Sequence, residues 1–167
     1  LLSKNYDVKV SEVHGMGQRG GSVVTYVKYG SKVASPIVAL GEADLILSFE
    51  QLEAARWLPY LKKGGTIITN TQKMDPMPVV MGAAEYPHDI LDAIRAKGVN
   101  LVAVDALSMA VEAGSAKAVN VALIGVMARN MDLEKQVWKD TIAATVPAKF
   151  LEMNEKAFEL GYASQGE

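Results

Sequence analysis

"ADLILSFEQLEAARWLPYLKKGGTIITN", residues 43–70, decides the fold class. Its first seven residues form a short apolar run, which is typical of a strand buried on both faces. Residues 50–65 then favour a helix, and Gly64-Gly65 is expected to end it. The apolar residues that share one face of this helix are Leu52, Ala55, Leu58 and Leu61. Pro59 could end the helix early or kink it, and "TIITNT" reads as the next strand.

The alternation of strands and helices continues toward the C-terminus. The pattern predicts a helix over 87–98, a strand over 100–106 and a short helix over 107–114. Three further helices are predicted over 116–130, 132–146 and 147–163. Such alternation predicts an α/β fold: an open, mostly parallel, Rossmann-like sheet flanked by helices, with a helical C-terminal end.

Two more strands are predicted ahead of this unit. Residues 7–13 alternate in polarity, and residues 22–30 are rich in Val, Thr and Tyr. A turn is expected at 30–32, with residues 33–38 running back as a hairpin partner of the second strand. A glycine loop separates the two strands.

Composition narrows the classes of function. The 167 residues suit one domain, half of them are apolar, and the net charge of −2 gives no sign of a nucleic-acid partner. The absence of cysteine excludes thiolate chemistry and cysteine-ligated clusters in these residues. The longest apolar stretch, 118–128, is too short for a membrane span. With no visible signal peptide, the cytoplasm is the expected compartment.

The glycine loop, "HGMGQRGG" at 14–21, is the main candidate site. Glycines allow backbone N–H groups to approach and surround an anion. Arg19 adds a planar cationic fork, and Gln18 and His14 add polar groups. The loop is therefore either an anion-contacting site or a plain strand connection whose arginine pairs with a surface carboxylate.

The ends of other strands offer further polar groups. Ligands of open α/β sheets bind beyond the carboxyl ends of the strands. We expect the loop at 14–21 to share one crevice there with 49–50 and 70–72. Glu50 and Glu53, at a predicted helix start, are expected to cap that helix. The two histidines have no metal-ligand spacing, and no metal site is expected.

Several blocks of the chain resemble one family. "SEVHGMGQRGGSVVTYV" is similar to the loop of the γ-type domain of 2-oxoacid:acceptor (ferredoxin) oxidoreductases, with the indolepyruvate branch most alike. The similarity continues through residues 41–72, 84–87 and 146–163, and so covers nearly the whole chain as a single domain, 1–167.

The resemblance implies a subunit of a complex that oxidatively decarboxylates 2-oxoacids, in this branch arylpyruvates, to acyl-CoA and CO2 and passes electrons to ferredoxin. It implies that a large α subunit holds thiamine diphosphate, Mg and the iron–sulfur clusters, and that this chain, inactive alone, completes the active site or the coenzyme A site at a subunit boundary. The residues that match the family's loop are Glu12, His14, Gly15, Gln18, Arg19, Gly20 and Gly21. Among them Arg19 is the expected contact to a substrate carboxylate or a phosphate.

The resemblance departs at the N-terminus. Members of the family begin with a strand and a "GxGGQG"-type glycine turn, which this sequence lacks. A sheet with a gap at the position of that first strand would be an improbable stable fold, so we expect this segment to be truncated or disordered in the sample.

Two other functions stay open. The chain could be a stand-alone module that binds a nucleotide or coenzyme A, or a purely scaffolding subunit. Association with a partner is favoured by large apolar side chains that either pack inward or await a partner: Trp57, Tyr60, Met74, Met77 and Met81.

Overall fold

The computed structural model describes residues 1–14 and 23–166. Within them the strands are β1 (Asp7–His14), β2 (Val23–Gly30), β3 (Ala43–Ser48), β4 (Leu61–Asn70) and β5 (Asn100–Val104). The α-helices are α1 (Gln51–Trp57), α2 (Met77–Val80), α3 (Ile90–Arg95), α4 (Ala106–Ala113), α5 (Val119–Arg129), α6 (Lys135–Thr145) and α7 (Leu151–Ala163). Short 3-10 turns are η1 (Leu2–Lys4), η2 (Leu58–Tyr60), η3 (Ala116–Ala118) and η4 (Ala148–Phe150).

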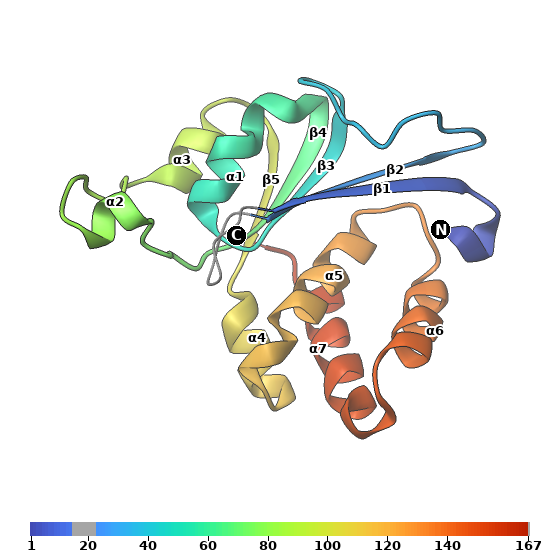
Figure 1. Ribbon diagram of the computed structural model, residues 1–167. Helices are drawn as coiled ribbons and strands as arrows, with labels where there is room; N and C mark the ends of the chain where they lie inside the picture. The colour runs from blue at the N-terminus through green and yellow to red at the C-terminus, as the bar shows by residue number, and fades with distance from the viewer. Residues whose placement is uncertain (15–22, 167) are drawn as a thin grey trace.

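A parallel sheet in the order β3-β4-β5 forms the centre of the fold (Figure 1). Both faces of this sheet are buried. Adjacent residues of β4 point to opposite faces, and each face packs against different helices. Ile67 packs in one cluster with residues of α1 and α3, whereas Ile68 packs in another with residues of α4, α5 and α7. The α/β fold class is thereby confirmed, as is the helical C-terminal end.

The helical end is held by close contact between α5 and α7. A side chain at Gly125 would overlap the carbonyl oxygen of Phe158, and one at Gly161 would overlap that of Ala122. These two glycines let the helix backbones touch, and the ring of Phe158 is completely buried beside them. The two helices are therefore in direct backbone contact at both glycines.

The predicted strands 7–13 and 22–30 pair with each other. β1 and β2 form an antiparallel two-stranded sheet, with Asp7 opposite Gly30 and His14 opposite Val23. The predicted pairing with 33–38 is wrong, since those residues, all described, form no strand. Polar contacts hold this segment against the hairpin instead: the Val33 N–H donates to Asp7 at 2.8 Å. The hairpin has no ladder to the β3–β5 sheet among the described residues.

The helix predicted over 50–65 is shorter in the structure. α1 ends at Trp57, and Pro59 lies in the 3-10 turn η2, as expected of a residue that cannot continue a helix. β4 begins at Leu61, so Gly64 and Gly65 lie inside a strand and do not end the helix. Gly65 allows close approach there, since a Cβ would lie 3.0 Å from the carbonyl oxygen of Asp44 on the neighbouring strand.

Candidate functional site at the carboxyl ends of the parallel strands

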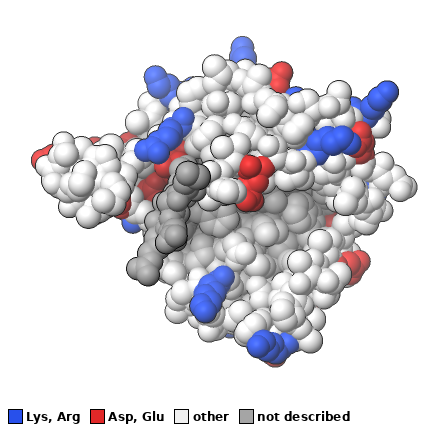
Figure 2. Space-filling view, viewed as in Figure 1, with Lys and Arg blue, Asp and Glu red and all other residues white. Residues whose placement is uncertain are grey.

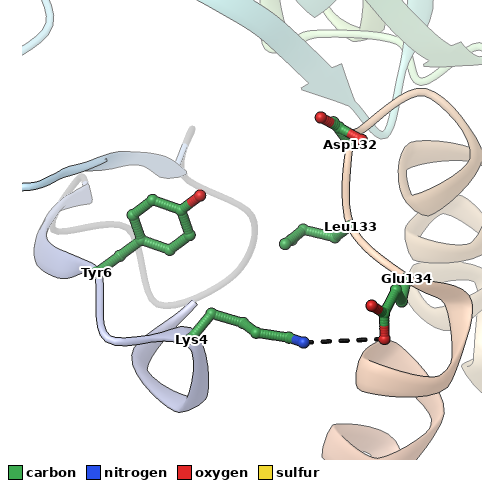
Figure 3. A pocket seen from close by; sticks show the side chains of 5 residues that line it. All are labelled: Lys4, Tyr6, Asp132, Leu133 and Glu134. Atoms are coloured by element: carbon green, nitrogen blue, oxygen red, sulfur yellow. Dashed lines mark ion pairs between the residues drawn. The ribbon is translucent and has the colours of Figure 1, made fainter.

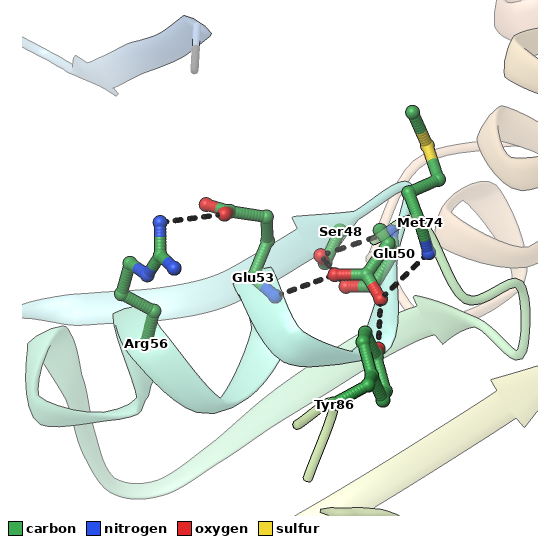
Figure 4. A network of polar contacts seen from close by, with 6 residues as sticks. All are labelled: Ser48, Glu50, Glu53, Arg56, Met74 and Tyr86. Atoms are coloured by element: carbon green, nitrogen blue, oxygen red, sulfur yellow. Dashed lines mark hydrogen bonds and ion pairs between the residues drawn. The ribbon is translucent and has the colours of Figure 1, made fainter. Parts of the chain in front are cut away.

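Glu50 is a buried carboxylate just beyond the end of β3. It is the N-cap of α1, and its Oε2 accepts a hydrogen bond from the backbone N–H of Glu53 at 3.0 Å. The Ser48 hydroxyl donates to the Glu50 carbonyl at 2.6 Å, which fixes the turn from strand to helix. The expected capping role of Glu50 is therefore confirmed; Glu53 lies in the first turn of α1 and pairs with Arg56 (Figure 4).

The second oxygen of Glu50 reaches two segments that follow later in the chain. Its Oε1 accepts hydrogen bonds from the Tyr86 hydroxyl and from the Met74 N–H, the latter at 3.4 Å (Figure 4). Burial raises the pKa of Tyr86, and the hydrogen bond to the Glu50 carboxylate raises that pKa further. One carboxylate thus joins α1 to the segment after β4 at two points.

The end of β4 is joined to the same edge by amide side chains. Gln51 Nε2 donates to the Thr71 carbonyl at 3.1 Å. The fully buried Asn70 accepts from the Ala106 N–H at 3.1 Å and donates to Gln72 at 3.2 Å. Gln51, next to Glu50, therefore brings the end of β3 against 70–72. The crevice predicted to include 14–21 as well stays a prediction, since 15–22 lie outside the described residues. Because these polar groups bond to protein atoms, their chemical effect is to orient the loops at the edge.

Asp105, directly after β5, orients the start of the next helix in the same way. Its Oδ1 accepts from the Ser108 N–H at 3.0 Å, and its Oδ2 accepts from the Ser108 hydroxyl at 2.6 Å. These hydrogen bonds lower the pKa of Asp105. Asp105 is the N-cap of α4.

Most of the glycine-loop candidates fall outside the described residues. They are Gly15, Gln18, Arg19, Gly20 and Gly21. His14 is described: it is the last residue of β1 and is exposed. Sequence reasoning missed Tyr86 and the joining role of Glu50, since 36 residues separate the two side chains and no local spacing connects them.

The pocket in Figure 3 lies elsewhere, between η1 and the turn before α6. It measures about 340 Å³ and is lined by Lys4, Tyr6, Asp132, Leu133 and Glu134. Lys4 and Glu134 form a 3.8 Å ion pair across it, and both are solvent-exposed, so the pair is weak. This pocket adjoins the start of β1, about 25 Å along the strand from His14.

Two absences hold for the described ranges, 1–14 and 23–166. No group of His, Asp or Glu there is arranged to hold a metal ion. None of the helices there has the length and apolar character needed to cross a bilayer.

The chain is similar to known proteins both in sequence and in fold. The model of the pyruvate ferredoxin/flavodoxin oxidoreductase family matches residues 1–164. The chain is 43% identical to indolepyruvate oxidoreductase subunit IorB of Thermococcus kodakarensis, over 96% of the chain and 82% of that protein. The γ subunit of a keto/oxoacid ferredoxin oxidoreductase from Geobacter sulfurreducens shares the fold, with TM-score 0.67 and 19% identity over 96% of this chain and 81% of that one.

A larger protein contains the same fold. The 2-oxoglutarate:ferredoxin oxidoreductase of Magnetococcus marinus, solved with 2-oxoglutarate, coenzyme A and succinyl-CoA bound, matches 95% of this chain and 25% of its own, with TM-score 0.65 and 17% identity.

Proposed function

Because this chain belongs to the pyruvate ferredoxin/flavodoxin oxidoreductase family, we propose that it is the small subunit of an indolepyruvate-type 2-oxoacid:ferredoxin oxidoreductase. The observation that carries the proposal is the 43% identity to an IorB subunit along 96% of the chain. The three-stranded parallel core and its polar strand ends suit a domain that presents loops at a subunit boundary.

The proposed reaction joins a 2-oxoacid and coenzyme A to give acyl-CoA and CO2, and two electrons pass to ferredoxin. The 167 residues contain no cysteine, so they offer no thiolates for clusters. We therefore assign thiamine diphosphate, Mg and the clusters to a large α subunit, and place the complex in the cytoplasm. The task of this chain is to complete the active or coenzyme A site.

Reconstitution tests this assignment. The chain and the α subunit, purified separately, are mixed and assayed for ferredoxin reduction that depends on both indolepyruvate and coenzyme A. Each subunit alone is expected to be inactive and the mixture active. An α subunit that is equally active without this chain would contradict the proposal. So would tight binding of coenzyme A to the isolated chain, with no change of activity on mixing, which is the result expected of a stand-alone binding module.

Within the complex, the proposed anion contact is Arg19, supported by His14, Gly15, Gln18, Gly20 and Gly21. The support is chemical: a guanidinium on a glycine-rich loop binds carboxylate or phosphate with a fork of donors. Arg19→Ala is expected to raise the KM for coenzyme A or for the 2-oxoacid, on the order of tenfold or more. Arg19→Lys, the matched control, keeps the charge and should retain part of the affinity. If the loss of activity in Arg19→Ala simply follows a lower Tm, the arginine is structural.

A further inference from the structure

The segment between β4 and α3, residues 71–89, projects from the body of the molecule as a lobe that carries α2 (Figure 1). We call it the methionine arm. Backbone hydrogen bonds within the arm fix its conformation. The Met81 N–H donates to the Met77 carbonyl at 2.9 Å, and the Ala83 N–H donates to the Pro78 carbonyl at 2.8 Å. The arm therefore has a defined shape without any partner.

Glu50 fixes both ends of the methionine arm to the body. Its Oε1 accepts from the Met74 N–H near the beginning of the arm and from the Tyr86 hydroxyl near the end. The Lys73 ammonium lies 5.8 Å from the centre of the Tyr86 ring, which adds a cation–π contact between the same two ends. An element held in this way loses little conformational freedom when it binds.

The tip of the arm is apolar and exposed. The large apolar side chains at the tip are 64–69% exposed, and they are Met77, Val80 and Met81. Met74, near the beginning of the arm, is 59% exposed. Trp57 and Tyr60 were predicted to be either buried or available to a partner, like these methionines. They pack around Tyr26 of β2, with ring centroids 6.3 and 6.5 Å from the centroid of that ring. A cluster of exposed methionines on a projecting element marks an interaction surface, because the thioether side chain adapts to many partner shapes.

The charges of the arm indicate what it would contact. Residues 71–89 contain one basic residue, Lys73, and three acidic residues, Asp75, Glu85 and Asp89. Their net charge is therefore −2 with histidine neutral. In Figure 2 the corresponding lobe is mostly uncharged, with acidic side chains at its edges. A second copy of the arm would meet this one with like charge, which costs affinity. The complementary surface is therefore an apolar groove with a basic rim.

We propose that the methionine arm inserts into an apolar groove, rimmed by lysine and arginine side chains, on the large α subunit. The inference rests on the proposed function, which supplies that partner. It assigns the hydrophobic part of the contact to Met77, Val80 and Met81, and the electrostatic part to Asp75 and Glu85. Glu50 acts as a positioning residue that holds the arm at its fixed angle.

The test measures binding to the purified α subunit separately from activity, by biolayer interferometry with this chain immobilised. The arm variant is Met77→Ser/Met81→Ser. The matched control is Leu40→Ser/Val111→Ser, which removes two other side chains, 67% and 58% exposed, that lie outside the arm. A charge variant, Asp75→Lys/Glu85→Lys, is compared at low and high salt. Each variant is also checked for an unchanged Tm.

The arm variant is expected to bind the α subunit at least ~10-fold more weakly, with an unchanged Tm, while the control binds like the wild type. The charge variant should lose most affinity at low salt, because salt screens exposed charges. Equal binding by the wild-type chain and the arm variant would overturn the inference and leave the proposed function intact. A wild-type chain that does not bind the α subunit would instead overturn the proposed function. An isolated chain that dimerises through the arm, so that only the arm variant sediments as a monomer, would show that a second copy is the occupant and overturn the inference.

Discussion

The α5–α7 contact and the methionine arm use apolar residues in opposite ways. Between α5 and α7, glycines bring the backbones together and Phe158 is fully enclosed, so the apolar surface is buried within the chain. In the arm, methionines of comparable size remain mostly exposed on a backbone that is already formed. The difference teaches that hydrophobicity alone does not assign a residue to the core. The same chemistry stabilises the fold in one region and is available for a partner in the other.

The largest expected effect is at the helix pair. Phe158→Ala removes a ring that is completely buried and leaves a cavity that the close helices cannot fill. We expect the free energy of unfolding to fall by about 3–5 kcal/mol. Urea denaturation followed by circular dichroism measures it. A loss below ~1 kcal/mol would show that the helix contact is looser than described.

A matched pair of glycine substitutions makes the comparison sharper. In Gly161→Ala the new Cβ overlaps the Ala122 carbonyl, so the helices must separate, and we expect a loss of about 3 kcal/mol. Gly82 of the arm has φ +71° and nothing within 4 Å of the added Cβ. Gly82→Ala should therefore cost only the backbone strain, about 1–2 kcal/mol. Thermal unfolding of both variants measures the two losses of stability. Equal losses in Gly161→Ala and Gly82→Ala would contradict the expected order.

Tyr86 tests the joint between the arm and the body. Tyr86→Phe loses the hydrogen bond to Glu50 and should cost ~1 kcal/mol at neutral pH. The pKa of Tyr86 is raised in the folded state, so its contribution is complete below the ordinary pKa of about 10 and declines as pH rises above that value. The stability gap between the wild type and the variant should therefore narrow above pH ~10.

Urea titrations of both proteins from pH ~8 to ~11 measure that gap. Tyr26 and Tyr29, whose pKa values burial also raises, are present in both proteins and cancel in the difference. A gap that stays constant through this range would show that Tyr86 ionises equally in the folded and unfolded states.

The smallest effect is expected at the tip of the arm. Met81 is 69% exposed, so Met81→Ala should change the free energy of unfolding by no more than about 0.5 kcal/mol. The same denaturation assay applies, with Phe158→Ala as the reference for a buried apolar residue. A loss approaching that of Phe158→Ala would mean that Met81 belongs to the core of this chain.

Local patterns predicted much of the fold and part of the site. The strands predicted at 43–49 and 100–106 form at 43–48 and 100–104, because a run buried on both faces is mostly apolar, and Pro59 marked the end of α1. The contact between the segment after β3 and residues 70–72 is consistent with the rule for parallel strand ends. The Glu50–Tyr86 contact could not be predicted, because it joins residues with no shared local pattern.

By itself the sequence determined the alternation of strands and helices from 43 onward, the absence of cysteine chemistry in these residues, and the family, since each depends on residue types and short spacings. The tertiary structure decided that β2 pairs with β1 and not with 33–38, and that one carboxylate ties both ends of the methionine arm. It also decided which apolar residues are covered. The physical reason is that pairing and burial depend on which surfaces meet after the chain folds, and distant segments compete for the same contacts.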